Sequence, residues 1–363
     1  MKPASLPLNF EHWDVVNDGL HNSNTDLIYW RDAFYLVHAA SPYHFGNAKC
    51  RLVILRSVDA KTWQRIAEFG ADGEDIRDPK FAAIGERLFL YALKNRDFKA
   101  EPYTSVYTIS EDGDHWPHYQ KIEPEGWLFW RPKTRDGINW YVPAYWWEHG
   151  KSVLLRSPDG MNWAIHSTIY EGDRNDETDF EFLPDGRMLV TARLEVSESI
   201  FGSAQGSTLI TIADPPYTDW TRRTKSYLTR LDGPCLFSYH GQVYAVGRYQ
   251  PKLNGPFSLQ GSTFAKKRSS LFAVHEDKLV RLFDLPSSGD TSYAGCVLRG
   301  DDLYTCYYTS DITKDPIWIY GMFRPTAIRM AKIDMREVKK SARPDKVLMD
   351  NPDTILVARR AIQ

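Results

Sequence analysis

The sequence predicts an all-β protein, a single six-bladed β-propeller domain over residues 1–363. Two observations support this fold class. Aromatic residues make up 13% of the chain, and 23 Gly and 21 Pro supply frequent turns, a composition typical of short strands joined by tight turns. The chain also repeats itself at intervals of about 50 residues, and repeats of that length are typical of propeller blades.

The first repeat is a short turn motif of the form S-x-D-x-x-x-W. It occurs at residues 57–63, 110–116 and 157–163, each time after a run of strand-forming residues. The Asp carboxylate in such a turn accepts backbone N–H bonds, and the Trp ring is large enough to pack between sheets. Each motif therefore predicts a hairpin between two strands. A degenerate copy lies near Asp214 and Trp220.

The second repeat is longer: a polar start, an apolar strand, a polar turn and another apolar strand. Its six starts are spaced by about 53 residues on average, at Asp26, Asp78, Arg131, Glu177, Asp232 and Asp290. Six such units predict six blades. A pair of β-sandwiches is the alternative, but sandwiches have no reason to repeat at a fixed period. We expect the N-terminal segment 8–16 to complete the last blade and close the ring.

The polar starts are also the candidate functional positions. The innermost strand of each propeller blade lines a central channel, so these starts are expected to converge at one mouth of it. Arg77 directly precedes one of them. Arg193 and Arg248 each follow a turn glycine by seven residues, and His38 ends the second strand of the first unit in the same way.

The S-x-D-x-x-x-W turns resemble the Asp boxes of the sialidase-like (BNR-repeat) superfamily, whose members are six-bladed propellers. The fourth unit carries a further resemblance, because Glu177 precedes Arg193 by 16 residues with the turn Asp185-Gly186-Arg187 between them. The segment 291–295, Thr-Ser-Tyr-Ala-Gly, resembles the segment that bears the catalytic tyrosine of sialidases.

This resemblance implies a glycoside hydrolase, exo-acting on a glycan with a terminal acidic sugar. Tyr293 would be the nucleophile, Glu177 would activate it, and Arg193 and Arg248 would hold the sugar carboxylate. A neutral tyrosine suits such a substrate because a carboxylate nucleophile would be repelled by an acid at the anomeric carbon, and tyrosine nucleophiles are known among glycosidases. Arginine binds a planar carboxylate through paired hydrogen bonds.

Sialidases carry a third arginine, and residues 21–26, where it is expected, contain none. Arg77 or Arg131 would supply this guanidinium from another blade, and His38 is a further candidate substrate ligand. The general acid would be Asp26 or Asp78, since both stand at the start of a repeat unit.

The tripeptide Arg77-Asp78-Pro79 also resembles the RDP element of five-bladed furanosidases. In that arrangement Asp26, Asp78 and Glu177 would form three axial carboxylates, and two carboxylates flanking a glycosidic bond are the general requirement for hydrolysis. The count of six units and the turn motifs favour the sialidase-like arrangement.

Two other functions remain open from the sequence. A polysaccharide lyase acting on uronic acids would use the arginines to neutralise the sugar carboxylate and His38 or Tyr293 to abstract a proton. A propeller that binds carbohydrate without turnover would show charged residues already paired with one another.

Composition and motifs exclude several other classes. The net charge of −2 argues against nucleic-acid and membrane-surface partners, and no apolar run approaches the ~20 residues that span a bilayer. The first residues lack the apolar core of a signal peptide, so we expect a cytoplasmic protein, although a removed leader would leave export open. The sequence lacks zinc-protease and nucleotide-binding motifs, so we expect no metal and no cofactor, and a carbohydrate as the partner.

The four cysteines form no CxxC pair, which argues against a zinc ribbon. Cys296 and Cys306 flank a predicted hairpin turn and could approach each other across it. Free thiols are favoured over a disulfide because no export signal is visible.

Overall fold

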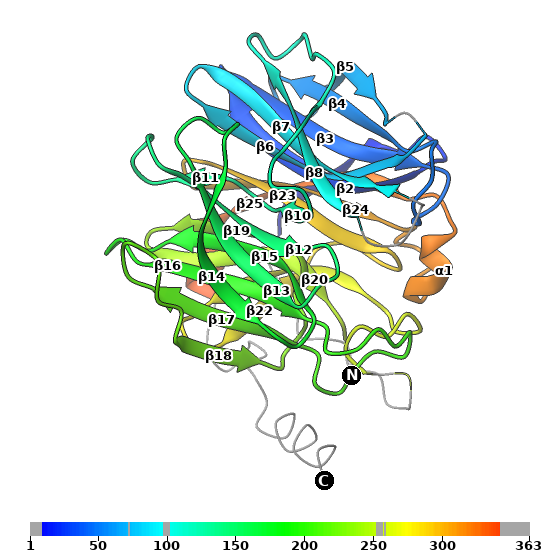
Figure 1. The fold of residues 1–363 in the computed structure, drawn as a ribbon. Helices are drawn as coiled ribbons and strands as arrows, with labels where there is room; N and C mark the ends of the chain where they lie inside the picture. Colours follow the sequence, from blue (N-terminus) through cyan, green and yellow to red (C-terminus); the bar gives the residue numbers. More distant parts are fainter. Residues whose placement is uncertain (1–8, 72, 97–101, 252–256, 258, 342–363) are drawn as a thin grey trace.

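The computed structural model describes residues 9–341, apart from residues 72, 97–101, 252–256 and 258. Within this part, six antiparallel sheets are arranged as blades around a central axis (Figure 1). The prediction of an all-β, six-bladed propeller is therefore confirmed. In five of the six blades the first strand contacts the first strand of a neighbouring blade, so these strands form the innermost ring, and the chain runs outward from it.

Each blade has four strands and blade 3 has a fifth; in blades 1 to 5 the strands follow chain order. Blade 1 contains β2 (His21–Trp30), β3 (Ala33–Ser41), β4 (Arg51–Ser57) and β5 (Gln64–Phe69). Blade 2 contains β6 (Asp75–Ile84), β7 (Arg87–Asn95), β8 (Thr104–Ser110) and β9 (Gln120–Lys121). Blade 3 contains β10 (Trp127–Phe129), β11 (Lys133–Thr134), β12 (Trp140–Trp146), β13 (Lys151–Ser157) and β14 (Ala164–Glu171).

The second half of the ring follows the same plan. Blade 4 contains β15 (Asn175–Phe182), β16 (Met188–Leu194), β17 (Ser207–Ala213) and β18 (Arg222–Ser226). Blade 5 contains β19 (Asp232–Tyr239), β20 (Gln242–Tyr249), β21 (Arg268–Val274) and β22 (Leu279–Asp284). Blade 6 contains β23 (Thr291–Arg299), β24 (Asp302–Thr309), β25 (Ala327–Asp334) and β1 (Glu11–Val16).

The ring is closed within blade 6 by strands from opposite ends of the sequence. β1 pairs antiparallel with β25, from Glu11 opposite Lys332 to Val16 opposite Ile328. The outermost strand of the last blade therefore comes from the start of the chain. The indole of Trp13 on β1 also donates to the carbonyl of Ala60 in blade 1, at 3.0 Å.

The hydrophobic core is divided into six main clusters, each filling the space between two neighbouring blades. Between blades 1 and 2, for example, Tyr35 and Leu52 pack with Phe81 and Leu90, all at most 5% exposed. Burying each such side chain stabilises the fold by about 1.5–3 kcal/mol. Because every cluster draws on two sheets, each blade depends on both of its neighbours.

The three repeated turns lie between the third and fourth strands of blades 1, 2 and 3. In the third copy, Asp159 Oδ1 accepts the backbone N–H groups of Met161 and Asn162 at 2.8 Å each. Gly160 of this turn faces the preceding blade, where the Tyr91 hydroxyl donates to its carbonyl at 2.7 Å. A Cβ atom at Gly160 would lie 2.4 Å from Ile84. The turns therefore join neighbouring blades as well as strands.

Residues 134–140, Thr-Arg-Asp-Gly-Ile-Asn-Trp, form a fourth turn of this kind that the sequence analysis missed. Asp136 Oδ1 accepts the N–H groups of Ile138 and Asn139 at 2.9 and 2.7 Å. The sequence pattern missed this copy because Thr134 stands where the other three copies have a serine. It also lies between β11 and β12, whereas the other three copies follow the longer strands β4, β8 and β13 further out in their blades.

A β-bulge recurs in the innermost strand of five blades. The register shifts lie between the pairs Ser23/Asp26, Arg77/Lys80, Asn175/Thr178, Asp232/Cys235 and Ser292/Gly295. Four of the bulges contain a residue with positive φ: Asn24 (50°), Asp78 (50°), Gly233 (62°) and Tyr293 (47°). A bulge interrupts the alternation of a strand and redirects a side chain. The bulges therefore supply side chains that a regular strand could not direct to the channel mouth.

The helices are short. The described part of the chain contains α1 (Trp318–Met322) and α2 (Met335–Ser341). Neither helix is long and apolar enough to cross a bilayer.

All four cysteines are free thiols, and three of them are buried. Cys296 and Cys306 are not bonded to each other.

Candidate functional site

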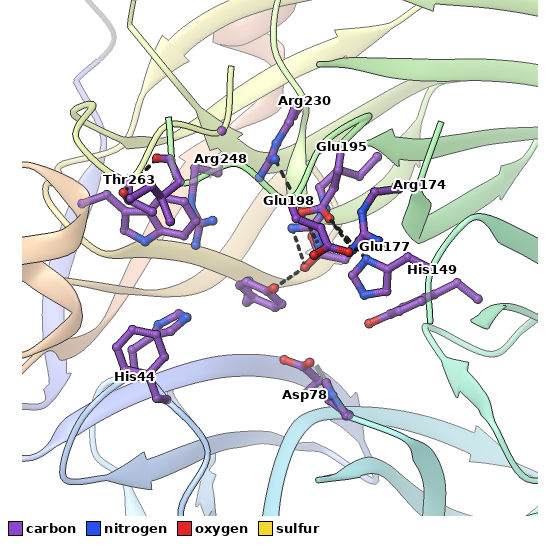
Figure 2. A pocket seen from close by; sticks show the side chains of 18 of the residues that line it. His44, Asp78, His149, Arg174, Glu177, Glu195, Glu198, Arg230, Arg248 and Thr263 are labelled. Carbon is purple, nitrogen blue, oxygen red and sulfur yellow. Dashed lines mark hydrogen bonds and ion pairs between the residues drawn. The ribbon is translucent and has the colours of Figure 1, made fainter. Parts of the chain in front are cut away.

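A cavity of about 610 Å³ opens where the bulged inner strands meet. Its walls come from all six blades and from α1. Figure 2 shows Asp78 and His44 on one side of the cavity, across the open space from Glu177, Glu195 and Arg230. The volume is typical of a site for a small ligand.

The central feature is a hydrogen bond between two residues 116 positions apart in the chain. The hydroxyl of Tyr293, in the bulge of β23, donates to Glu177 Oε1, in the bulge of β15. Glu177 Oε2 accepts the backbone N–H of Gly233 at 2.5 Å. The carboxylate is therefore fixed by the bulge of a third blade.

The surroundings change the protonation of both groups. Burial raises the pKa of Glu177 to about 7; Arg193 opposes this shift, whereas Asp176 and Asp232 add to it. Burial, and after it the nearby Glu177 carboxylate, raises the pKa of Tyr293 well above its usual value. Glu177 is thus a group that can take up and release a proton near neutral pH, next to a tyrosine that keeps its own proton.

Arg193, on β16, holds the other side of Glu177. Its Nη1 lies 2.9 Å from Glu177 Oε1, and its Nε donates to Asp176 Oδ1 at 2.7 Å. Arg193 Nη1 also lies 3.7 Å from Asp232. Arg193 thus touches acidic groups of two blades and fixes their positions relative to each other.

Asp232 connects three arginines at the start of blade 5. Arg230 Nε donates to its Oδ1 at 3.0 Å, and Arg248 Nη1 donates to its Oδ2 at 3.2 Å. Arg248 also donates to the carbonyl of Thr291 at 2.7 Å. Burial disfavours the ionised form of Asp232, but the guanidinium groups of Arg230, Arg193 and Arg248 lower its pKa overall.

Asp78 faces the Tyr293–Glu177 pair from blade 2. Its backbone has φ +50°, and the following Pro79 lies in the same bulge. The side-chain amide of Asn24 donates to Asp78 Oδ1, and this hydrogen bond links the bulge of β2 to the bulge of β6. Arg77, which also lines the cavity, donates to Asp75 at 2.5 Å and to the carbonyl of His44 at 3.1 Å.

Six of the nine residues predicted from the sequence line the cavity: Arg77, Asp78, Glu177, Arg193, Arg248 and Tyr293. The structure does not bring Asp26, Arg131 and His38 to it.

Asp26 and Arg131 lie deeper in the channel and bind each other. Arg131 Nη2 donates to Asp26 Oδ1 at 2.9 Å and Nε donates at 3.1 Å. Asp26 Oδ2 also accepts the backbone N–H of Phe81 at 2.7 Å. The structure thus places Asp26 and Arg131 in a buried ion pair between blades and not among the residues that line the cavity, so a general acid at Asp26 and a substrate ligand at Arg131 stay predictions that their positions do not favour.

His38 is 1% exposed within blade 1. Burial lowers its pKa to about 4, so it stays neutral. It does not line the cavity, so its roles as a substrate ligand and as the base of a lyase stay predictions that its position does not favour.

Several cavity residues were missed by the sequence analysis: Asn24, Arg174, Glu195, Glu198, Arg230, His44 and His149. Most are close in sequence to residues that were singled out, since Arg230 stands two positions before Asp232 and Glu195 two positions after Arg193. Aromatic walls come from Tyr145, Trp147 and Trp318, which suit stacking against a sugar ring.

Two groups of side chains among the described residues bring possible metal ligands together: His149 with Asp176 and Glu195, and His21 with His44 and Asp290. In the first group Arg193 contacts both carboxylates, Asp176 at 2.7 Å and Glu195 at 3.5 Å. That guanidinium already supplies the positive charge that a metal ion would bring.

No protein-family model and no curated protein matches this chain. Among solved structures, phage phi92 endosialidase is similar with a TM-score of 0.68 and 9% identity, over 90% of this chain and 69% of that one. A mutant of Trypanosoma rangeli sialidase displaying trans-sialidase activity gives 0.67 and 10%, over 92% of this chain and 60% of that one. A mutant of NanB sialidase from Streptococcus pneumoniae gives 0.61 and 10%, over 90% and 70%.

This chain therefore spans only part of the length of each of these sialidase structures, 60% in the Trypanosoma rangeli case. At such low identity the likeness shows the fold: a six-bladed propeller resembling that of sialidases.

Proposed function

We propose that this protein is a retaining glycoside hydrolase that removes a terminal sugar bearing a carboxylate at its anomeric carbon. Tyr293 acts as the nucleophile, Glu177 as its base, and Asp78 as the general acid. The observation that carries the proposal is the hydrogen bond from the Tyr293 hydroxyl to Glu177 in the wall of a sugar-sized cavity, with Asp78 on the opposite wall.

The residues fit a double displacement. Tyr293 Oη attacks the anomeric carbon and gives its proton to Glu177, while Asp78 protonates the departing glycosidic oxygen. Water then attacks the anomeric carbon and displaces the Tyr293 oxygen; Asp78 takes a proton from the water, and Glu177 returns its proton to the departing Tyr293 oxygen. Because the attacking atom begins as a neutral hydroxyl, it approaches a carboxylate-bearing carbon without charge repulsion.

Arg193 and Arg248 are the groups that would hold the sugar carboxylate. Arg248 has five N–H groups, and its hydrogen bonds within the described chain go to Thr291, Asp232 and Tyr308. The remaining N–H groups are available to a ligand in the cavity that Arg248 lines. The buried carboxylates behind the arginines fix the guanidinium planes in advance, which reduces the ordering required on binding.

The experiment compares hydrolysis of fluorogenic glycosides of sialic acid, glucuronic acid and galactose. We expect turnover of the first substrate, with kcat reduced about 10³-fold or more in Tyr293→Phe and about 10²–10⁴-fold in Glu177→Gln. Tyr239→Phe is the matched control, because Tyr239 also donates to a carboxylate, Asp301 at 2.8 Å, but does not line the cavity. Full turnover in both Tyr293→Phe and Glu177→Gln would refute the mechanism.

The existing ion pairs favour a second candidate function, sugar binding without turnover. Arg193, Arg230 and Arg248 all contact carboxylates already, as expected for a site that is not built around a free cluster of guanidinium groups. Calorimetric binding of sialic acid, together with no hydrolysis of any of the three glycosides by the unmodified protein, would support this function instead. Release of an unsaturated uronate from a separate substrate, a 4-linked uronic-acid oligosaccharide, would instead indicate a lyase using Tyr293.

A further inference from the structure

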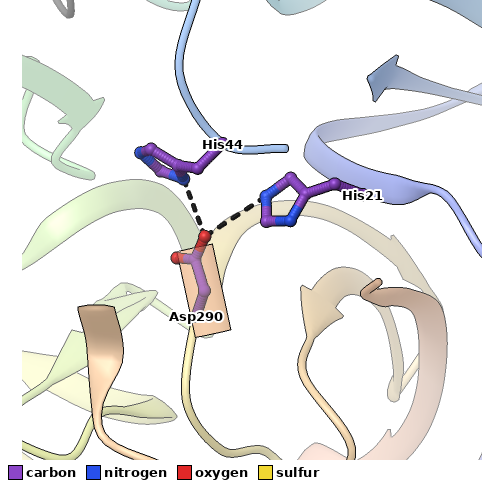
Figure 3. A group of neighbouring side chains, drawn as sticks. All are labelled: His21, His44 and Asp290. Atoms are coloured by element: carbon purple, nitrogen blue, oxygen red, sulfur yellow. Dashed lines mark hydrogen bonds and ion pairs between the residues drawn. The ribbon is translucent and has the colours of Figure 1, made fainter. Parts of the chain in front are cut away.

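A second group of side chains lies beside the cavity, where blade 6 meets blade 1. His21 on β2, His44 in the loop after β3, and Asp290 just before β23 converge on one point (Figure 3). His44 Nδ1 lies 2.7 Å and His21 Nε2 lies 3.3 Å from the same oxygen, Asp290 Oδ2. His21 and Asp290 are fully buried, and His44 reaches the cavity.

The hydrogen bonds of His21 determine where its ring proton lies. Its Nδ1 is 2.8 Å from the carbonyl oxygen of Arg324. A carbonyl only accepts, so Nδ1 carries the proton and the neutral ring presents a lone pair at Nε2. That Nε2 is buried and makes no hydrogen bond within the described chain. In the neutral ring, this lone pair faces Asp290 Oδ2 at 3.3 Å, so either a second ring proton on Nε2 or a bound cation must offset the repulsion between the two atoms.

Asp290 is oriented in the same way by its neighbours. Its Oδ1 accepts hydrogen bonds from the Tyr308 hydroxyl at 2.9 Å and from the Trp318 indole at 2.8 Å. Arg248 Nη2 is 3.7 Å from this same Oδ1. Tyr308, Trp318 and Arg248 all approach Oδ1. The other oxygen, Oδ2, faces the imidazoles of His21 and His44.

We propose that His21 Nε2, His44 Nδ1 and Asp290 Oδ2 bind a divalent transition-metal ion of the zinc class. Two imidazoles and one carboxylate are a common ligand set for zinc, with a fourth position left for water. Ligands at about 2.0–2.1 Å in tetrahedral geometry lie roughly 3.3 Å from one another. The distances of 2.7 and 3.3 Å to Asp290 Oδ2 need only small adjustments to reach that spacing.

The outer contacts match what metal-binding ligands require. A ligating histidine usually donates its second ring N–H to a carbonyl or carboxylate, as His21 does to Arg324. The other group of possible ligands, around His149, is a weaker candidate for a metal site, because Arg193 already contacts both of its carboxylates, Asp176 and Glu195. The sequence showed no metal motif because the three ligands are separated by 23 and 246 residues.

The experiment measures metal binding directly and uses no substrate, so it is independent of the proposed hydrolase activity. The full chain is stripped with EDTA and titrated with Zn²⁺ against a chromophoric chelator, and with Co²⁺ while its visible absorption is recorded. We expect one ion per chain and the strong visible bands of tetrahedral cobalt. We also expect affinity to fall as the pH is lowered, because both imidazoles must be free of the proton at the ligating nitrogen.

Variants test the location of the ion. His44→Gln should lower zinc affinity at least about tenfold, whereas the matched control His149→Gln should leave it unchanged. Circular dichroism confirms that both variants are folded, and the cobalt spectrum of the unmodified protein tests the site even if a variant is not. Zinc affinity equal in the unmodified protein and His44→Gln would overturn the proposal. So would loss of binding in His149→Gln, or no bound ion at all, which would mean that the group holds a proton instead.

Discussion

Tyr293 combines a strained backbone with a fixed side chain. Its φ of +47° is one that bulky residues rarely adopt, at a cost of about 1–3 kcal/mol. Two hydrogen bonds stabilise this conformation: Thr25 Oγ1 donates to the Tyr293 carbonyl at 2.5 Å, and Ser292 Oγ donates to the Asp232 carbonyl at 2.8 Å. Contacts with blades 1 and 5 therefore maintain the strained backbone, and this conformation positions the Tyr293 hydroxyl to donate to Glu177 without a bound ligand.

The protonation of Glu177 predicts a pH dependence of catalysis. The base must be ionised to accept the Tyr293 proton, and its pKa is raised to about 7, chiefly by burial. We therefore expect kcat/KM for the acidic glycoside to fall tenfold per pH unit below about 7. The measurement is a pH–rate profile of the unmodified protein, with Glu177→Gln as the comparison. An acidic limb near pH 4.5, the usual value for glutamate, would contradict this assignment.

The same shift predicts a pH-dependent effect on stability. Glu177 titrates near its ordinary pKa of 4.5 in the unfolded chain and near 7 in the folded one, so the folded state binds the proton more tightly. Ionisation of Glu177 therefore destabilises the fold progressively between about pH 4.5 and 7. Relative to the unmodified protein, Glu177→Gln should be more stable at pH 8 than at pH 4, as measured by urea unfolding at both values. A difference that does not change with pH would argue against the raised pKa.

At the scale of the element, the bulges explain which site residues the sequence could not place. Asp26 and Asp78 both open a repeat unit, yet Asp78 lies in its bulge whereas Asp26 is the first paired residue after one. The structural counterpart of Asp78 is Asn24, two residues earlier. A register shift depends on pairing with another strand, so composition and spacing do not reveal it. Glu177 and Tyr293 were found because their neighbouring residues resemble a known pattern.

The repeated turns, by contrast, could be recognised because their hydrogen bonds are local. Partial burial disfavours the charge on Asp159, but hydrogen bonds from Asn162 and Met161 lower its pKa to about 2. Asp159→Ala should lower the free energy of unfolding by about 1–3 kcal/mol at pH 7. This loss should disappear as the pH falls from about 4 to below 2, where the carboxylate protonates. Asp159→Asn, which keeps an acceptor oxygen, should lose less, and equal losses in the two variants would contradict the proposed role.

For the whole molecule, the sequence predicted the number of blades because each unit must bury two faces against its neighbours and so repeats the same pattern. It could not predict the blade-to-blade contacts, such as the ion pair of Asp26 with Arg131, because these join residues 105 positions apart. Such contacts follow from closure of the ring, which is a property of all six units together.

Closure itself can be tested at Trp13. Its indole bonds to Ala60 and its ring lies 5.1 Å from the Lys61 ammonium, so β1 holds blade 6 against blade 1. Trp13→Ala should lower the free energy of unfolding by about 3 kcal/mol, and Trp13→Phe, which keeps an aromatic ring, by clearly less. Thermal unfolding measures both. If Trp13→Ala had the melting temperature of the unmodified protein, this contact would not contribute to ring closure.

The recurring bulges also bear on how such a scaffold can change its chemistry. A residue inside a bulge stands outside the cross-strand pairing, so its identity is only weakly tied to the stability of the sheet. Asn24, Asp78 and Tyr293 can therefore be exchanged without removing a cross-strand pair, whereas Gly233 cannot, because a Cβ atom there would lie 2.8 Å from the backbone nitrogen of Tyr293. One unchanged framework can in this way acquire new reactivities through a handful of substitutions, which makes these positions the natural targets for redesigning the specificity of the protein.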